Sequence, residues 1–216
     1  MIQSNSYGLL ITMHSYNALA SNDAYGSAYG TGDFYTDSTA QWAFDDRLKY
    51  ILNHNHSTLG TLWKELMILV LTGGESCMSE SVQPDYLTCD ALDVISIHAY
   101  GVMDYNTSSI ETYVQQAQAA GKLLLMEEWG ACYFNTDNNN CPTGDALFTS
   151  ARDANIVGWA GNITAAGLPW LYWEVLPNAD PDFEIGIGDP SWPTLQQVAM
   201  DTLQAPAAFD FSPYLL

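Results

Sequence analysis

Five short apolar runs, separated by stretches with helical character, constrain the fold of this chain more than any other feature of its sequence. Strands buried on both faces of a parallel sheet read as continuous apolar runs, and such runs in alternation with helices are typical of parallel α/β proteins. The runs are YGLLITMH (7–14), MILVLTGG (67–74), LDVISIHAY (92–100), KLLLMEEWG (122–130) and LPWLYWEV (168–175). Helices are expected over 39–52, 110–120 and 145–166. The pattern therefore predicts an α/β fold with parallel strands.

The chain is strongly acidic. Its 216 residues contain 25 Asp and Glu against five Lys and Arg, which gives a formal net charge of −20. Such a surface repels nucleic acid and anionic membranes, so neither is expected as a partner. No apolar run reaches the length of a membrane-spanning helix, and the chain length suits one core rather than two. The acidity favours a neutral partner, or it serves solubility alone.

The sequence predicts neither a metal site nor a cofactor. His54 and His56 have no third ligand at useful spacing and are interpreted as a solvated helix end. The nucleotide-binding patterns GxGxxG and GxxxxGK are absent. The four cysteines include no CxxC pair, but Cys132 and Cys141 flank the polar loop YFNTDNNN, which a disulfide between them could close.

Several features favour an extracellular location for the complete protein. Asn-X-Ser/Thr sequons begin at Asn55, Asn106 and Asn162, lysine is scarce, and the number of cysteines is even. The first residues, MIQSNSYGLLITMHSYN, are not a signal peptide, because they lack a basic segment and their apolar run is short. A secreted protein with this sequence is therefore expected to start upstream of Met1.

The run LLLMEEWG ends an apolar strand with two acidic residues. Burying a carboxylate is costly unless another group compensates for it. Neighbouring residues of a strand point to opposite faces, so one of Glu127 and Glu128 is expected to face an open site and the other to face away. A carboxylate beside the indole of Trp129 is a candidate nucleophile for glycoside hydrolysis. The alternative is a strand end that simply reaches solvent.

Two further strand ends carry candidate functional residues. His98 and Tyr100 are two positions apart and share one face, where they can orient a carboxylate by hydrogen bonds. A core histidine bonded to the backbone is the alternative. In LPWLYWEV, Trp170 and Tyr172 share one face and Trp173 lies on the other. An indole at this position can stack on a sugar ring or pack in the core.

Taken together and in this order, the motifs resemble secreted fungal members of glycoside hydrolase family 5, which include endo-β-1,4-mannanases and cellulases. HSYNAL…YGTGDFYTD is similar to the end of barrel strand three, TGG to strand five, IHAY to the His-x-Tyr of strand six, EEWG to the nucleophile motif of strand seven, and WLYWEVLPNADP to strand eight. The resemblance covers most of residues 7–192. It implies a (β/α)8 TIM barrel and a retaining mechanism.

The resemblance also implies roles for individual residues. Glu128, directly before Trp129, is the implied nucleophile. His98 and Tyr100 are implied to contact the nucleophile or the substrate, and Trp173 to stack under the bound sugar. The residues implied in substrate binding are His14, Asn17, His98, Tyr100, Trp129 and Trp173.

The missing second carboxylate is the main departure from the family pattern. A retaining glycosidase needs it roughly 5 Å from the nucleophile, and in the family it follows Asn at the end of strand four. No Asn-Glu occurs here, and the nearest candidate is Glu75 in LTGGESCM. About twenty residues separate 67–72 from Asp93, too few for two crossovers of about a dozen residues or more. The run 67–72 therefore fits strand five, and strand four is missing.

One incomplete barrel domain is expected, with strand three, a loop and a helix in 1–66 and strands five to eight with a tail in 67–216. The expected activity is retaining β-glycoside hydrolysis, with β-1,4-mannan as the favoured substrate and cellulose or another β-glucan as alternatives. Without strand four, the chain as written is expected to be inactive. A non-catalytic remnant that binds sugar is the competing hypothesis, and no protein partner is implied.

Overall fold

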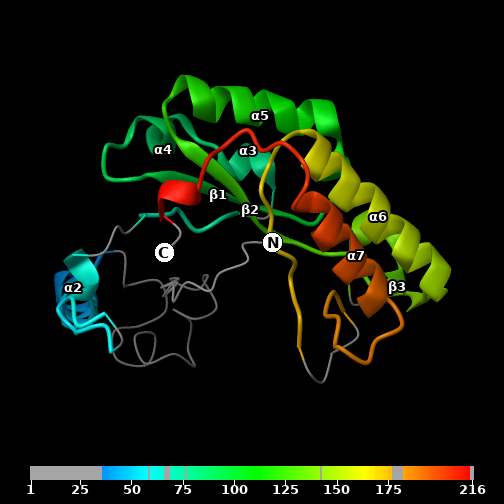
Figure 1. The fold of residues 1–216 in the computed structure, drawn as a ribbon, viewed down its shortest axis with the longest axis horizontal. Helices are drawn as coiled ribbons and strands as arrows, with labels where there is room; N and C mark the ends of the chain where they lie inside the picture. The colour runs from blue at the N-terminus through cyan, green and yellow to red at the C-terminus, as the bar shows by residue number, and fades with distance from the viewer. Residues whose placement is uncertain are drawn as a thin grey trace. The chain divides into compact units, whose positions relative to one another are not determined.

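The computed structural model describes residues 36–57, 59–65, 69–75, 77–141, 143–176 and 182–214. They belong to two compact units, one that includes the described residues up to 69 and one that includes those from Val70 onward. The elements, drawn in Figure 1, are the helices α2 (Ser38–Leu52), α3 (Met78–Ser81), α4 (Pro84–Thr88), α5 (Thr107–Ala119), α6 (Thr149–Ala165) and α7 (Trp192–Thr202), the strands β1 (Val94–Ala99), β2 (Leu123–Trp129), β3 (Phe134–Asn135) and β4 (Asp145–Ala146), and the 3-10 helices η2 (Trp63–Glu65), η3 (Val102–Tyr105), η4 (Asp137–Asn139) and η5 (Ser212–Tyr214).

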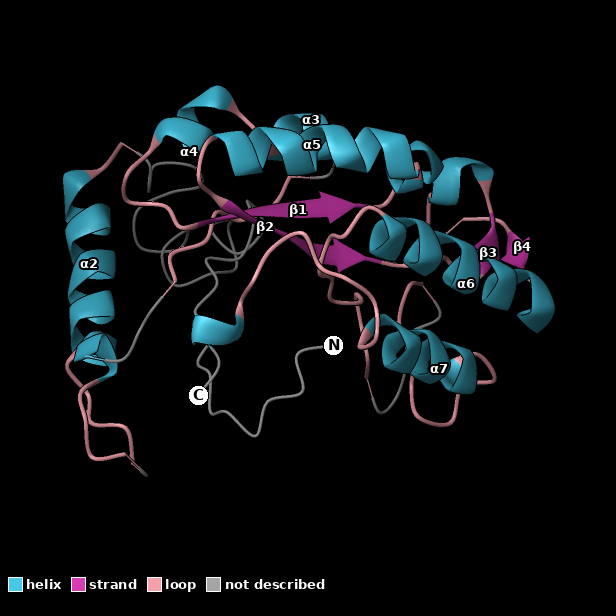
Figure 2. Cartoon of the chain, turned by 45° about the horizontal axis from the view of Figure 1, so that its top comes forward, coloured by secondary structure: helices cyan, strands magenta, loops and turns pink. Residues whose placement is uncertain are grey.

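The larger unit is built on two parallel strands, β1 and β2, whose arrows point the same way in Figure 2. Their ladder begins with Val94 opposite Leu123, and α5 makes the crossover between them. The strands predicted over 92–100 and 122–130 are thus confirmed. The structure is α/β with a parallel sheet, as the apolar runs predict.

One further segment joins each strand by a single parallel bridge, Leu71 to Val94 of β1 and Trp170 to Met126 of β2. Four parallel segments therefore lie side by side in the order in which the chain presents them. The two outer segments form much less strand than predicted. In the first, Ser96 donates its N–H to the Thr72 hydroxyl (2.8 Å) rather than to a carbonyl. In the second, Pro169 has no N–H to donate. The predicted run 7–14 lies outside the described residues.

The three predicted helices are confirmed as α2, α5 and α6, with shifted ends. Helix α5 begins at Thr107 because Asn106 caps it, its Oδ1 accepting from the N–H of Ser109 (3.2 Å). Helix α6 begins at Thr149 rather than at 145, because Asp145 and Ala146 pair with β3 instead. Helix α7 was not predicted, although a proline in its first turn is a typical start signal.

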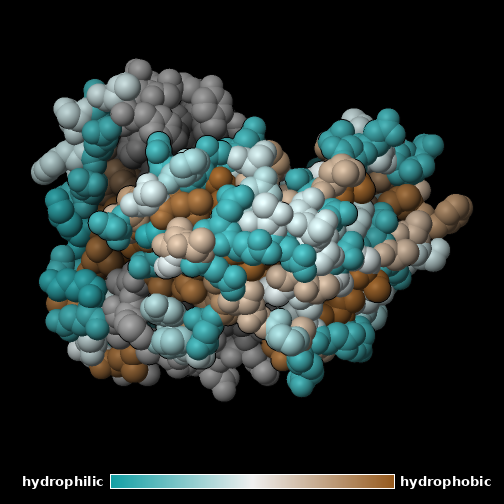
Figure 3. Space-filling view, turned by 90° about the horizontal axis from the view of Figure 1, so that it is seen from above, coloured by the Kyte–Doolittle hydropathy of each residue, from teal (hydrophilic) through white to brown (hydrophobic). Residues whose placement is uncertain are grey.

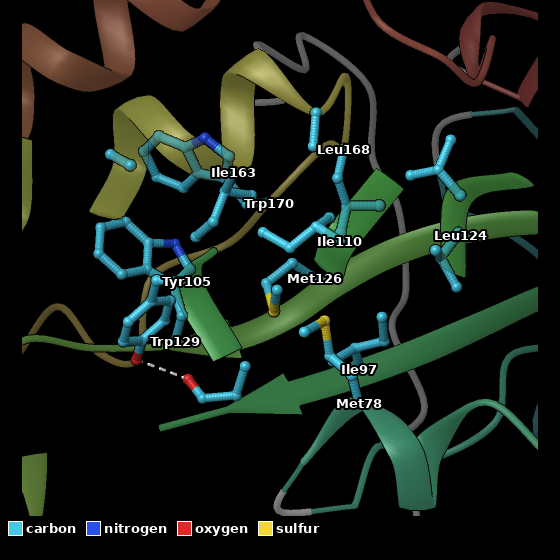
Figure 4. Close-up of a cluster of buried hydrophobic side chains, with 14 of the residues drawn as sticks. Met78, Ile97, Tyr105, Ile110, Leu124, Met126, Trp129, Ile163, Leu168 and Trp170 are labelled. Atoms are coloured by element: carbon cyan, nitrogen blue, oxygen red, sulfur yellow. Dashed lines mark hydrogen bonds between the residues drawn. The ribbon is translucent and has the colours of Figure 1, made fainter. Parts of the chain in front are cut away.

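The core of the larger unit lies between the strands and the helices α5 and α6 (Figure 4). Ile97 and Met126 pack from the strands against Ile110 and Ile163 from the helices, and all four side chains are fully buried. Each large apolar side chain buried in this way stabilises the fold by about 1.5–3 kcal/mol. Because the helices cover this face of β1 and β2, any functional group on the strands must project from the opposite face or from the strand ends.

The surface shown in Figure 3 is a mosaic of hydrophilic and hydrophobic residues. Large apolar side chains that remain exposed include Met103 and Phe148. Among the described residues, none of the helices combines the length and the apolar character needed to span a bilayer.

In the smaller unit, Asp37 caps the start of α2, and its carboxylate accepts from the N–H groups of Thr39 (2.7 Å) and Ala40 (3.0 Å). These bonds, that of Ala40 first, lower the pKa of Asp37. The interpretation of His56 as solvated is wrong, because the side chain is only 3% exposed. A turn closes over it, its Nδ1 accepts from the N–H of Leu59 (3.1 Å), and its ring packs on Trp63. His54 is exposed, as expected.

Candidate active site

A β-bulge in β2 decides where the two glutamates point. The ladder pairs Ile97 with Met126 and then His98 with Glu128, so Glu127 is one residue more than the partner strand has. Met126 and Trp129 both lie in the helix-covered core although they are three positions apart. Strict alternation would have put Glu128 in that core. The prediction that the two glutamates face opposite sides is therefore wrong, because the bulge interrupts the alternation between them.

Burial energies explain the bulge. A fully buried indole removes a large apolar surface from water, whereas an unpaired carboxylate in the same place would cost several kcal/mol. The extra residue allows Trp129 to enter the core and keeps both carboxylates out of it. Bulges commonly re-aim a side chain beside an active site, and this one turns Glu128 toward the end of β1.

His98 lies between the two carboxylates. Its Nδ1 is 3.3 Å from Oε2 of Glu128, and its Nε2 is 3.6 Å from Oε2 of Glu127. The three side chains are 22%, 17% and 11% exposed in the order His98, Glu128, Glu127, so the cluster is shielded but open to a ligand. The imidazole ring therefore presents one nitrogen toward each carboxylate.

Tyr100 completes the cluster. Its hydroxyl donates a hydrogen bond of 2.7 Å to Oε2 of Glu128. Burial, and then the bond to Glu128, raise the pKa of Tyr100 far above its ordinary value. The phenol is thus a neutral donor throughout the physiological range. Its ring also packs on Phe183, with the ring centroids 4.8 Å apart.

Glu174 is an acidic residue near the cluster that the sequence did not single out. Its charge contributes to the raised pKa of Tyr100, which places it in the electrostatic neighbourhood of the cluster. It directly follows Trp173, to which a cis peptide bond joins it. The available signal was its position at the end of the run LPWLYWEV, where a functional carboxylate of a parallel α/β protein is expected.

Two glycines permit the close approach of the segments around the cluster. A Cβ added to Gly74 would lie 2.6 Å from the backbone nitrogen of His98 and closer still to its ring. A Cβ added to Gly130 would lie 2.6 Å from the carbonyl oxygen of Trp173. Both distances are shorter than real Cβ contacts. The four segments therefore converge at the end of the sheet toward which β1 and β2 point.

Trp129 cannot contact a substrate, which corrects its assignment to sugar binding. The side chain is 0% exposed, and its ring makes edge-on contacts with Trp170 (5.2 Å) and Tyr172 (5.0 Å). The indole is a packing residue because its large apolar surface gains more from the core than from the strand end. Trp173 is partly exposed, and its N–H donates to the carbonyl of Trp129 (2.8 Å), next to the cluster.

A disulfide and a buried arginine hold the loops around the cluster in place, and neither contacts the cluster itself. A disulfide joins Cys132 and Cys141, whose Cα atoms are 5.6 Å apart. Arg152 of α6 is 2% exposed and donates to the carbonyls of Ala131 (3.1 Å) and Phe183 (3.0 Å). It thereby fastens the loop after β2 to the loop before α7. Sequence reasoning missed Arg152, although it is one of only five basic residues and lies inside a largely uncharged helix, which was a usable signal.

The remaining candidates lie elsewhere. His14 and Asn17 fall outside the described residues. Glu75 is exposed, and its N–H donates to the Ser81 hydroxyl (2.9 Å). Two cavities of about 340 Å³ are lined by other residues, one along α2 and one by apolar side chains near the ends of α6 and α7. No group of three His, Cys, Asp or Glu within the described ranges could hold a metal ion.

No protein-family model and no curated protein sequence matches the chain. Solved structures do match in fold. An endo-1,4-β-mannanase from Rhizomucor miehei aligns with a TM-score of 0.56 at 17% identity, over 80% of this chain and 64% of that one. An endo-β-1,4-mannanase from Thermotoga petrophila aligns with a TM-score of 0.55 at 14% identity, over 88% of this chain and 55% of that one. A glycoside hydrolase family 5 mannosidase from Rhizomucor miehei aligns with a TM-score of 0.54 at 13% identity, over 88% and 68%.

These likenesses concern the fold. The chain spans less than two thirds of the length of the first two structures that it matches. What it shares with them is the α/β arrangement built on parallel strands.

Proposed function

We propose that this chain belongs to a lineage of retaining β-glycoside hydrolases of family 5, with part of a (β/α)8 barrel and with β-1,4-mannan as the substrate. The observation that carries the proposal is the hydrogen bond from Tyr100 to Glu128, beside His98, at the carboxyl ends of adjacent parallel strands. In α/β barrels, active sites lie at this end of the strands. The similarity of the fold to two endo-mannanases and a mannosidase supports the same assignment.

In the proposed reaction, a carboxylate oxygen of Glu128 forms a bond to the anomeric carbon as the bond to the leaving oxygen breaks. The hydrogen bond from Tyr100 to Oε2 holds the carboxylate in one orientation and leaves the other oxygen to attack. Because Tyr100 remains neutral, it does not repel the nucleophile. Trp173, partly exposed beside the cluster, offers an indole face for the sugar ring.

The leaving oxygen must be protonated by a second acid, roughly 5–5.5 Å from the nucleophile in a retaining enzyme. Within the described part of the chain, three glutamates are candidates for this role: Glu75, Glu127 and Glu174. Glu75 is exposed, and Glu127 faces His98 from the same strand as the nucleophile. We therefore expect the chain to react with glycosides whose leaving group needs no proton, and to turn over mannan itself poorly or not at all.

Covalent trapping tests the nucleophile independently of the second acid. A 2-deoxy-2-fluoro-β-mannosyl fluoride carries fluoride as its leaving group. Fluoride leaves without being protonated, so the reagent can form the glycosyl-enzyme without a second acid. We expect intact-protein mass spectrometry to show one added fluoromannosyl group and peptide mapping to place it on Glu128. Glu128→Gln should abolish the labelling, whereas Glu111→Gln, which changes an exposed acid on α5, should not. Labelling of another acid, or none at all, would overturn the assignment.

Turnover of polysaccharides then tests the substrate and the second acid. β-Mannan, carboxymethylcellulose and a β-1,3-glucan are compared, and cleavage of only a glucan would replace the mannanase proposal with a cellulase or glucanase. If mannan is cleaved, Glu75→Gln, Glu127→Gln and Glu174→Gln are assayed on mannan and on 2,4-dinitrophenyl β-mannoside. The second acid is identified by the variant that no longer cleaves mannan but still reacts with 2,4-dinitrophenyl β-mannoside. Cleavage that none of the three variants impairs would exclude all of them.

A second function, non-catalytic sugar binding, is favoured by one specific observation, the absence of an Asn-Glu pair from the sequence. The two functions predict different results in the trapping experiment: a retaining hydrolase is labelled on Glu128, and a non-catalytic binder is not. Binding of manno-oligosaccharides in a calorimeter, without covalent labelling of Glu128, would support it. Labelling of Glu128 would reject it.

A further inference from the structure

Asn139 connects the ends of the two strands that carry the cluster. Its Nδ2 donates to the carbonyl oxygen of Tyr100 (2.7 Å), directly after β1, and to that of Gly130 (2.8 Å), directly after β2. Its Oδ1 accepts from the N–H of Cys132 (2.8 Å). The side chain thus uses both amide hydrogens and the amide oxygen on three backbone groups that belong to two different strand ends.

These contacts fix the orientation of the amide. The reversed amide would set its oxygen against two carbonyl oxygens and its NH2 group against an N–H, so only one orientation satisfies the site. Asn139 is 6% exposed, and its backbone has a φ of 61°, a left-handed conformation that asparagine tolerates better than most residues. Residue type, backbone conformation and side-chain contacts therefore agree at this position.

The loop that carries Asn139 is closed at its base. It leaves β2 through Cys132, passes through η4 and returns to Cys141, and the disulfide joins these two residues. Figure 2 shows the neighbouring strands β3 and β4 on the side toward which the arrows of β1 and β2 point. The disulfide limits the conformations available to the nine residues that follow Cys132. It therefore holds Asn139 between the strand ends.

We propose that Asn139 is a positioning residue for the nucleophile, because it sets the separation of the Tyr100 and Glu128 segments and thereby their hydrogen bond. This inference rests on the proposed function of Glu128. Tyr100 carries the anchored carbonyl itself, and Gly130 is two residues beyond Glu128. When the amide is absent, the strand ends keep the pairing of Ala99 with Trp129 and the Tyr105 hydroxyl, which lies 2.7 Å from the carbonyl oxygen of Ala99 and 3.3 Å from that of Gly130. The segments beyond these contacts lose their direct link, and we expect the 2.7 Å bond between Tyr100 and Glu128 to lengthen.

The test is Asn139→Gly, which keeps the left-handed backbone accessible and removes the amide. Its matched control is Asn138→Gly. Asn138 has a similar φ of 53° in the same loop, but it is exposed, and its side chain accepts only from the N–H of Val102 among the bonds described. We expect Asn139→Gly to slow trapping by the fluoromannosyl fluoride by about tenfold to a hundredfold, as a misplaced reacting group does, and Asn138→Gly to change it less than about twofold.

A double-mutant cycle with Tyr100→Phe separates positioning from a general loss of structure. If Asn139 acts through the Tyr100–Glu128 bond, Asn139→Gly should slow trapping much less in the Tyr100→Phe background than in the native one. Equal slowing in both backgrounds would overturn the proposal. So would native trapping kinetics in Asn139→Gly.

A readout independent of activity distinguishes this inference from the proposed function. In protein with ¹³C-labelled tyrosine, the Tyr100 signal is assigned by its loss in Tyr100→Phe and followed through the alkaline range. Tyr100 should remain protonated near pH 10, where exposed tyrosines ionise, and should ionise earlier in Asn139→Gly. If native protein is never trapped, the proposed function fails, but an earlier ionisation in the variant still supports the positioning role. Unchanged ionisation would reject it.

A second variant keeps the proposal falsifiable if Asn139→Gly does not fold. Cys132→Ala with Cys141→Ala releases the base of the loop and leaves the amide in place. The expected effects are the same in direction and smaller in size: slower trapping and earlier ionisation of Tyr100. If the trapping rate and the ionisation of Tyr100 are both the same as in the native protein, the closed loop does not hold the strand ends.

Discussion

At the scale of single residues, the environment of Glu128 comes from two side chains of the neighbouring segment. Tyr100 donates to one carboxylate oxygen, and His98 lies against that same oxygen and against Glu127. Gly74 packs on His98 so closely that no side chain fits there. Each contact can be removed by one substitution, and each has a different expected signature.

Tyr100→Phe removes the hydrogen bond to Glu128 and little else, because the ring and its packing on Phe183 are retained. A hydrogen bond to a charged group contributes about 1.5–3 kcal/mol, so trapping of the nucleophile should slow by about tenfold to a hundredfold. Stopped-flow fluoride release or timed mass spectra measure this rate. Tyr214→Phe, at a more exposed position, serves as the control. A Tyr100→Phe protein that is trapped at the native rate contradicts the role given to this bond.

Gly74→Ala should displace His98, because the added Cβ would lie 2.6 Å from its backbone nitrogen. We expect slower trapping and a loss of unfolding free energy of about 1–3 kcal/mol, the usual cost of overpacking. Gly73→Ala is a matched control one position away, since its Cβ would meet nothing within 4 Å. Urea denaturation and trapping kinetics measure both variants. Equal behaviour of the two alanine variants would disprove the close contact.

At the scale of elements, β2 is more than a regular strand, because its bulge serves two requirements at once. The core needs Met126 and Trp129 on the helix side, and the site needs a carboxylate beside His98. Because two residues separate Met126 from Trp129, both can face the core only if the strand bulges between them. If one residue separated them, regular alternation would place both in the core and the intervening glutamate on the opposite face.

Deletion of one glutamate, which turns LLLMEEWG into LLLMEWG, should therefore be tolerated. The remaining glutamate would follow Met126 on the opposite face, and Trp129 would return to the core without a bulge. We expect a folded protein that is still trapped on the remaining glutamate. Insertion of a third glutamate should instead destabilise the fold by several kcal/mol, because regular alternation would keep the indole in the core but place the middle carboxylate there as well. Thermal unfolding and trapping measure both, and an unfolded deletion variant would contradict the account of the bulge.

At the scale of the larger unit, buried tyrosines link stability to pH. Burial is the largest cause that raises the pKa of Tyr100, Tyr105 and Tyr172, in the last case to about 12. A tyrosine ionises near pH 10 in an unfolded chain. The folded state therefore holds these protons more tightly, and their contribution to stability is complete below about pH 10 and is lost as the pH rises further.

The free energy of unfolding should accordingly fall steeply between about pH 10 and 12. Each such tyrosine contributes a slope of about 1.4 kcal/mol per pH unit in that window. Urea denaturation at several pH values measures the slope. Tyr172→Phe should reduce it, and the control Tyr214→Phe should leave it unchanged. A slope that is the same in Tyr172→Phe and in the native protein would contradict the burial of this phenol.

Patterns among neighbouring residues were enough to predict the parts of this protein that depend on local periodicity. Continuous apolar runs located β1 and β2, and helical stretches located α2, α5 and α6. The run LLLMEEWG drew attention to the pair Glu127 and Glu128, and only the resemblance to a family selected Glu128 from it. These features can be predicted from short stretches of sequence, because a strand or a helix repeats its side-chain direction every few residues.

Which side chains meet depends on contacts between segments that are distant in the chain, and it could not be predicted from neighbouring residues. The bulge was hidden because register is a relation between two strands, and the burial of Trp129 follows from helices that pack over it. The bond of Tyr100 to Glu128 spans 28 positions, and that of Asn139 to Tyr100 spans 39. Such contacts carry no local signature, since they form only when the strand ends and the loop that crosses them are brought to the same edge of the sheet.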